Sequence, residues 1–131
     1  MKGRKSMNGK KILIVEDDHD TQVLLKKRLE YNGFQCESVD SVEAAFKALQ
    51  SFYPEVVILD LGFKKASGAA FLQNARKWLP TETPLPRVIV LSGHNHPQII
   101  DFVMASGANG FISKPFNPER LMTLVQENLF V

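Results

Sequence analysis

The chain has 131 residues, of which 44% are hydrophobic and 23% charged, and its formal net charge at pH 7 is +2. These values suit one globular domain, and the small charge gives no reason to expect direct binding to nucleic acid. Its apolar runs fall far short of the roughly 20 residues that span a membrane, and the single cysteine, Cys36, excludes an intramolecular disulfide. We therefore expect a cytoplasmic protein with no membrane partner.

The chain begins with the basic segment MKGRKSMNGKK, in which five of the eleven residues are Lys or Arg. This segment has no apolar stretch of the kind found in a secretory signal. We expect residues 1–9 to be an unstructured basic tail and residues 10–131 to form one folded domain.

Short apolar runs between turn residues predict four strands, and a weakly alternating stretch, Gln35–Val39, predicts an outer strand. Stretches with helical spacing of apolar residues predict five helices between and after the strands. The predicted strands are Lys11–Val15, Gln35–Val39, Glu55–Leu59, Arg87–Leu91 and Gly110–Ser113. The predicted helices are Thr21–Tyr31, Ser41–Phe52, Ser67–Leu79, Pro97–Ser106 and a last one that begins around Asn117. Strands that alternate with helices indicate an α/β fold, in which helices cover both faces of a parallel sheet.

Polar side chains follow four of the predicted strands at the point where each strand ends. Glu16 and Asp17 follow the first strand, Asp60 the third, and Ser92 the fourth, while Lys114 follows the fifth. In open parallel sheets, ligands bind outside the carboxyl ends of the strands. We therefore expect three carboxylates, a hydroxyl and an amine to meet at one edge of the sheet.

This set of groups suits the transfer of a phosphoryl group to a carboxylate. An exposed Asp can form an aspartyl phosphate. The incoming group is anionic, so a divalent cation is needed, and Mg²⁺ needs only one or two protein carboxylates. A lysine supplies a point charge to a phosphoryl oxygen, and a hydroxyl supplies a hydrogen bond.

Four motifs make this pattern specific: ILIVEDD, VVILDL with Gly68 eight residues after the Asp, VIVLSG, and SGANGFISKPF. With them the chain resembles a response regulator receiver domain, the phosphoacceptor module of two-component signalling, over nearly its whole length. The resemblance implies a doubly wound, flavodoxin-like (βα)5 sandwich of three layers. Its five-stranded parallel sheet would have the order 2-1-3-4-5 that chemotaxis regulators show.

The resemblance also implies roles for individual residues. Asp60 would be the phosphorylated residue. The cofactor would be Mg²⁺, with Mn²⁺ as a substitute, held by Glu16, Asp17, Asp60 and the backbone carbonyl of Gly62. Asp17 would be the direct metal ligand of the acidic pair. Asp18 lies one residue too late in the motif, and we expect it to be only solvated.

Three further roles follow from the same resemblance. Lys114 would contact the phosphoryl group, and the Lys114–Pro115 peptide bond would be cis. Ser92 would be the switch hydroxyl and Phe111 the switch aromatic. The sequence departs from the family after Asp60, where Lys64 replaces the usual Pro and Gly62 a commoner larger residue. We expect this loop to be more flexible than usual.

The function implied is that of a signalling domain, not of an enzyme acting on other molecules. It would take a phosphoryl group from a sensor histidine kinase or a phosphotransfer protein and catalyse only its own phosphorylation and dephosphorylation. The surface made by the fourth helix, fifth strand and fifth helix would then change for an output domain or a downstream protein. Homodimerisation on phosphorylation is a further option, and the chain could be a single-domain regulator or a piece of a longer one.

Two other functions use the same architecture or the same groups. A flavodoxin-like cofactor binder would need a glycine- and hydroxyl-rich phosphate loop after the first strand, where this chain has the anionic EDDHD. A phosphohydrolase with an Asp nucleophile would need a second acid two residues later, where this chain has Gly62. Flavin absorbance and phosphatase turnover discriminate these functions from signalling. A receiver-like domain without phosphorylation is disfavoured, because the acceptor, the acidic pair and the lysine are all present.

Overall fold

Five parallel strands form one sheet in the computed structural model, which describes residues 9–61, 65–93 and 96–129. The strands are β1 (Lys11–Val15), β2 (Gln35–Val39), β3 (Val56–Asp60), β4 (Arg87–Ser92) and β5 (Gly110–Ser113). The helices are α1 (His19–Tyr31), α2 (Val42–Ser51), α3 (Lys65–Asn74), α4 (Pro97–Ala105) and α5 (Pro118–Leu129). The sheet order is β2-β1-β3-β4-β5, which confirms the predicted doubly wound fold and its order.

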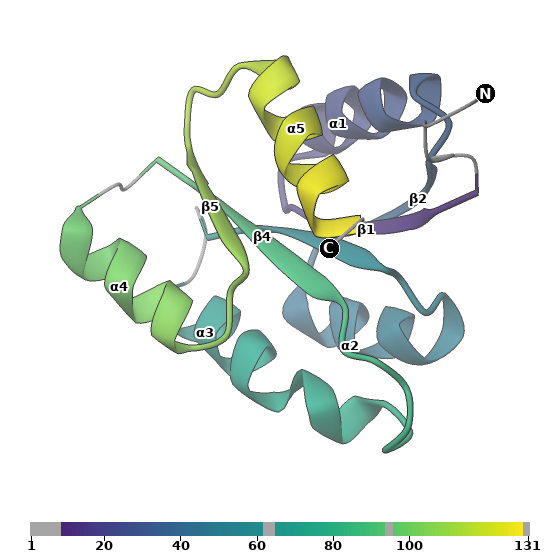
Figure 1. Ribbon diagram of the computed structural model, residues 1–131, viewed down its shortest axis with the longest axis vertical. Helices are drawn as coiled ribbons and strands as arrows, with labels where there is room; N and C mark the ends of the chain where they lie inside the picture. The colour runs from purple at the N-terminus through teal and green to yellow at the C-terminus, as the bar shows by residue number, and fades with distance from the viewer. Residues whose placement is uncertain (1–8, 62–64, 94–95, 130–131) are drawn as a thin grey trace.

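Alternating side chains of the strands build two separate hydrophobic cores, one on each face of the sheet. In Figure 1, α1 and α5 lie on one face, and α2, α3 and α4 cover the other. Toward α1 and α5, the strands contribute Ile12, Ile14, Ile58, Ile89 and Ile112. Toward the other three helices, they contribute Leu13, Val15, Val57, Leu59 and Val90. Because both faces are buried, the inner strands must be apolar at nearly every position.

Two strands end one residue later than predicted, and both added residues are polar. β3 ends at Asp60 and β4 at Ser92. The parallel ladder includes them, since Asp60 is in register with Leu91 and Ser92 with Ser113. The functional side chains therefore belong to the rigid sheet instead of the loops that follow it.

The predicted helix Ser67–Leu79 is divided in two. The α-helix ends at Asn74, and a 3₁₀ turn, η1 (Ala75–Trp78), follows it. The Trp78 ring stacks on Phe46 of α2 at a centroid distance of 4.9 Å, which fixes the end of this tighter turn against the neighbouring helix. No helix within the described ranges is long and apolar enough to cross a membrane.

Candidate functional site

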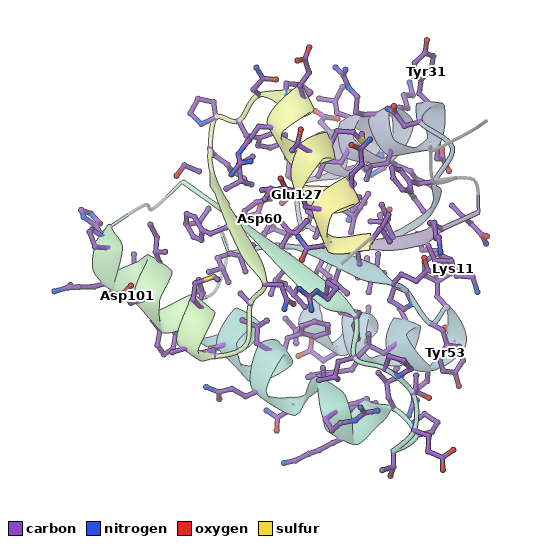
Figure 2. The ribbon with its side chains drawn as sticks, viewed as in Figure 1. Lys11, Tyr31, Tyr53, Asp60, Asp101 and Glu127 are labelled. Atoms are coloured by element: carbon purple, nitrogen blue, oxygen red, sulfur yellow. The ribbon has the colours of Figure 1, made fainter. Side chains whose placement is uncertain are left out.

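The carboxyl ends of four strands bring Glu16, Asp60, Ser92 and Lys114 to one edge of the sheet. Asp60 closes the central strand β3 and lies between β1 and β4. It is 2% exposed, and so it is far more buried than the exposed acceptor that the sequence analysis expects. Figure 2 shows it at the other end of the sheet from Lys11, which begins β1. A nearly buried carboxylate in a rigid strand requires a compensating charge.

Lys114 provides that charge. Its Nζ donates a hydrogen bond to Oδ2 of Asp60 in an ion pair and lies 3.6 Å from Oε1 of Glu16. Its backbone N–H donates to the Ser92 carbonyl at 2.8 Å, which anchors the residue to β4. Burial alone would lower the pKa of Lys114, but Asp60 and Glu16 outweigh this effect and raise it, so the amine remains charged. The Lys114–Pro115 peptide bond is cis, the isomer that the resemblance implies.

Glu16 is a buried carboxylate that lacks full compensation. Its side chain is almost inaccessible, and its Oε2 accepts a hydrogen bond from the Asp18 N–H at 3.1 Å. Its Oε1 is buried and has no hydrogen-bond partner. Burial raises the pKa of Glu16 to about 8, and neighbouring Asp60 adds to the rise, while the Asp18 N–H and the Lys114 charge oppose it. The site is therefore short of positive charge.

These two carboxylates fit a divalent cation, because Mg²⁺ takes one or two protein carboxylates and completes its shell with other oxygens. The incompletely compensated Oε1 of Glu16 is the observation that supports this fit. Asp17 is exposed on the loop after β1. Among the described residues, no three His, Cys, Asp or Glu side chains are gathered into a metal-binding group, so Asp17 does not complete such a group with Glu16 and Asp60. Gly62 lies outside the described residues.

Asp18 has a structural role that the sequence analysis missed. It is exposed, as expected, but it also caps α1: its carboxylate accepts hydrogen bonds from the Thr21 N–H at 2.9 Å and the Thr21 hydroxyl at 2.6 Å. These bonds lower the pKa of Asp18. The sequence does indicate this cap, because Asp directly before a helix is a preferred N-cap residue. The cap also explains why α1 begins at His19 and not at Thr21.

The two predicted switch residues lie on neighbouring strands. Ser92 is 1% exposed at the end of β4, and Phe111 lies on β5. Phe111 is partly buried and packs against the core on the side of α2, α3 and α4. Its ring therefore already packs inward, on the face of the sheet that α4 covers.

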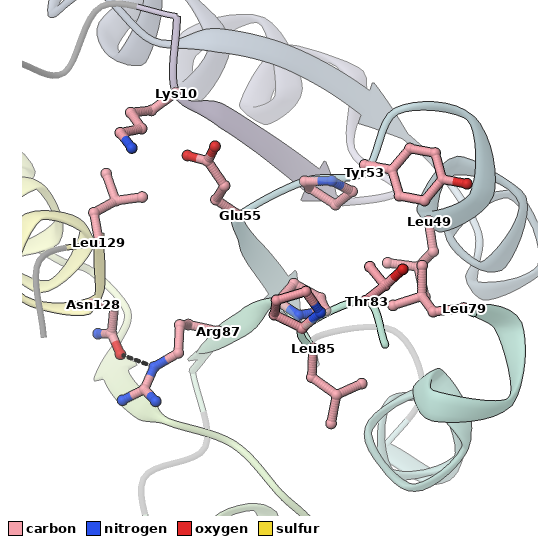
Figure 3. Close-up of a pocket in the computed structure, with 13 residues that line it drawn as sticks. Lys10, Leu49, Tyr53, Glu55, Leu79, Thr83, Leu85, Arg87, Asn128 and Leu129 are labelled. Atoms are coloured by element: carbon pink, nitrogen blue, oxygen red, sulfur yellow. Dashed lines mark hydrogen bonds between the residues drawn. The ribbon is translucent and has the colours of Figure 1, made fainter. Parts of the chain in front are cut away.

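Two open cavities lie at opposite ends of the sheet. One, of about 530 Å³, lies between α1 and the segment after β5, and its wall includes Leu24, Arg28 and Lys114. The other, of about 510 Å³, lies where β1, β3 and β4 begin (Figure 3). In its wall, Arg87 Nε donates to Asn128 Oδ1 at 3.3 Å. Only the first cavity borders a residue of the candidate site.

Comparison with known proteins agrees with the geometry. The family model of the response regulator receiver domain matches residues 12–126. The chain is 32% identical over 116 residues to the transcriptional regulatory protein KdpE of Staphylococcus aureus, covering 88% of this chain and 48% of that protein. It is 30% identical over 116 residues to the virulence transcriptional regulatory protein PhoP of Salmonella typhimurium, covering 88% of this chain and 50% of that protein. The chain thus spans about half the length of these curated relatives.

Solved structures show the same fold. A receiver domain of a response regulator from Bermanella marisrubri has a TM-score of 0.82 at 24% identity, covering 93% of this chain and 99% of that one. A CheY-like response regulator receiver domain from Methanospirillum hungatei has a TM-score of 0.80 at 25% identity, covering 93% and 94%. The family match, the sheet order and the groups at the carboxyl edge agree, and the chain belongs to the response regulator receiver domains of two-component signalling.

Proposed function

We propose that Asp60 accepts a phosphoryl group from the phosphohistidine of a sensor histidine kinase or of a phosphotransfer protein. One observation carries this proposal: Asp60 is a nearly buried carboxylate at the edge where ligands bind, paired with Lys114 and beside Glu16. A purely structural carboxylate would not need a second buried acid as a neighbour. The domain catalyses only its own phosphorylation and dephosphorylation.

In the transfer, a carboxylate oxygen of Asp60 attacks phosphorus, and the bond from phosphorus to the donor's imidazole nitrogen breaks. The electron pair of that bond leaves with the imidazole, which then takes up a proton, and Asp60 becomes an acyl phosphate. Lys114 moves its charge from the Asp60 carboxylate to an oxygen of the transferred group. The Ser92 hydroxyl donates a hydrogen bond to another of these oxygens.

Glu16, Asp17, Asp60 and the Gly62 carbonyl would hold Mg²⁺, or Mn²⁺ in its place. When bound, the cation would supply positive charge that offsets the crowded carboxylates and the phosphoryl oxygens. The buried Oε1 of Glu16, which has no hydrogen-bond partner, supports this assignment.

The signal would leave through Ser92 and Phe111. Movement of the Ser92 hydroxyl toward the phosphoryl group lets the Phe111 ring pack more deeply, and the surface of α4, β5 and α5 changes. That surface already presents apolar groups, since Phe102 and Met104 of α4 are exposed. We propose that it acts in the cytoplasm on an output domain or a downstream protein, with homodimerisation as a further response. Residues 10–131 would form this domain and residues 1–9 its tail.

The test of this function is phosphorylation in the presence of Mg²⁺. Incubation with acetyl phosphate should add one phosphoryl group to the wild type, as measured by intact-protein mass spectrometry. Asp60→Asn should gain none, whereas Asp20→Asn, which changes an exposed Asp in the first turn of α1, should react like the wild type. Equal labelling of Asp60→Asn and the wild type would refute Asp60 as the acceptor.

A further inference from the structure

Gln22 joins three elements around the acidic loop with one side chain. It is the fourth residue of α1, and its Nε2 donates hydrogen bonds to the Glu16 carbonyl and, at 3.1 Å, to the Val39 carbonyl. These carbonyls stand at the carboxyl ends of β1 and β2. A single amide thus connects α1 to both strand ends.

The backbone itself explains why this amide is needed. The ladder between β1 and β2 continues through the Glu16 N–H, which donates to Val39 at 3.0 Å. In a parallel ladder, the next donor to the Glu16 carbonyl would be the N–H of Ser41. Ser41 instead begins α2 as its N-cap, with its side chain accepting from the Ala44 N–H. The chain leaves the sheet at this point to form α2, and Gln22 supplies the donor to the Glu16 carbonyl in place of the Ser41 N–H.

The loop between Glu16 and Asp18 is therefore fixed at both ends. Asp18 fixes one end by capping α1 through Thr21, and Gln22 fixes the backbone of Glu16 at the other. The position of the Glu16 carboxylate is only partly fixed by its own contacts, because the group is buried from solvent and its Oε1 has no hydrogen-bond partner. Its placement therefore depends strongly on its backbone, which the Glu16 N–H holds to Val39 and which Gln22 holds through the Glu16 carbonyl.

We propose that Gln22 is a positioning residue, which sets the Glu16 carboxylate at the distance from Asp60 and Lys114 that a divalent cation requires. This inference rests on the proposed function, because it assumes that Glu16 and Asp60 bind Mg²⁺. Gln22 itself touches neither the cation nor the phosphoryl group. Its contribution is to hold the metal-binding carboxylate in place before the cation binds.

The experiment compares two variants that remove side-chain hydrogen bonds to strand backbone, two bonds in the case of Gln22 and one in the case of Asn109. Gln22→Met keeps the length of the side chain and removes its donor. Asn109→Ala removes a matched bond far from the site, in which Asn109 Oδ1 accepts from the Val88 N–H at 2.8 Å where β4 and β5 begin. Each protein is melted in EDTA and titrated with Mg²⁺ by isothermal titration calorimetry.

Both variants should melt at a lower temperature than the wild type, but only Gln22→Met should bind Mg²⁺ more weakly. The expected loss is about tenfold, the lower end of the range for groups that orient metal ligands. In acetyl phosphate reactions, the Mg²⁺ concentration for half-maximal rate should rise by the same factor, with the rate at saturating Mg²⁺ unchanged. If Gln22→Met does not fold, Gln22→Asn, which draws the amide back by one methylene, is measured in its place and should show the same loss.

An affinity for Mg²⁺ equal to that of the wild type in the Gln22 variant would overturn the inference. Equal losses of affinity in the Gln22 and Asn109 variants would overturn it too, because the effect would then follow stability and not position. A wild type that is phosphorylated but binds no Mg²⁺ would remove the metal role and this inference together. A wild type that is not phosphorylated at Asp60 would refute the proposed function itself.

Discussion

Lys114 and Glu16 make different contributions to the charge balance around Asp60. Lys114 is a charged amine whose pKa its two acidic neighbours raise, so it stays paired throughout the physiological range. Glu16 has the opposite character, because burial favours its neutral form. One cation for two buried carboxylates leaves a deficit that either a proton or a metal ion can fill. We therefore expect proton and metal to compete at Glu16.

Without metal, Glu16 should make the stability of the fold depend on pH. Burial raises the pKa of Glu16 from its ordinary 4.5 to about 8 in the folded chain, so between these values the folded state binds a proton that the unfolded state has lost. The stabilisation is complete below pH 4.5 and disappears as the pH rises through 8. In EDTA, the melting temperature of the wild type should fall over this window.

Glu16→Gln keeps the shape of the side chain but has no proton to lose. It should flatten the fall in melting temperature, and saturating Mg²⁺ should flatten it for the wild type. Glu37→Gln, at an exposed position on β2, is the matched control and should keep the slope of the wild type. A slope that survives in Glu16→Gln would show that another group is responsible.

At the scale of the elements, apolar runs predicted β1, β3 and β4 because these inner strands are buried on both faces of the sheet. The edge strand β2 was predicted from a weaker alternation of apolar and polar residues, and its outward side chains are exposed. Helix ends were predicted less well, since they depend on contacts that the local pattern does not encode. Stacking of Trp78 on Phe46, for example, joins residues far apart in the sequence. The cap at Asp18 could be predicted from the local sequence, but Asp18 also lies in an acidic motif typical of metal binding, and the motif alone does not distinguish the two roles.

Gly68 in α3 gives a prediction at this scale. A Cβ at this position would lie 2.1 Å from Cδ2 of Leu61, which is buried directly after Asp60. Helix propensity alone would favour Ala by about 1 kcal/mol. The overlap should reverse this sign, because displacing a buried side chain costs about 1–3 kcal/mol. Gly68→Ala should therefore lower the free energy of unfolding measured in urea.

The double variant isolates the cause. Leu61→Ala removes the side chain that the new methyl group would meet, so Gly68→Ala should cost less, or even stabilise, in that background. Gly93→Ala, where an added Cβ meets nothing within 4 Å, is the control and should change stability by at most about 0.5 kcal/mol. Additive effects of Gly68→Ala and Leu61→Ala would contradict the proposed overlap.

Across the whole molecule, the position of the site was predictable and its internal contacts were not. Parallel strands place their carboxyl ends at one edge, so polar residues at those ends had to be near one another. The sequence could not show that Lys114 pairs with Asp60 more closely than with Glu16, because this depends on how separate strand ends meet. Gln22 was also missed, since a Gln inside a helix gives no local signal.

The cavity beside Lys114 predicts where a phosphodonor protein docks. It is largely apolar, lies between α1 and the segment after β5, and has Leu24, 70% exposed, in its wall. A donor histidine must come close to Asp60, and this cavity borders the site through Lys114. Leu24→Glu should slow transfer from a phosphohistidine protein about tenfold, a loss of about 1.4 kcal/mol in the interaction. Acetyl phosphate needs no docking surface, so its rate should not change.

The control is Leu85→Glu, which changes an exposed Leu in the cavity where the strands begin (Figure 3). It places the same charge on the same residue type at the far end of the sheet, so it should leave both rates as in the wild type. Rates are measured by mass spectrometry with a histidine kinase that phosphorylates the wild type. If Leu24→Glu slows both donors alike, the charge acts on the site itself; if it slows neither, the donor docks elsewhere. Only a slower rate with the protein donor, together with an unchanged rate with acetyl phosphate, identifies the face between α1 and β5 as the docking surface.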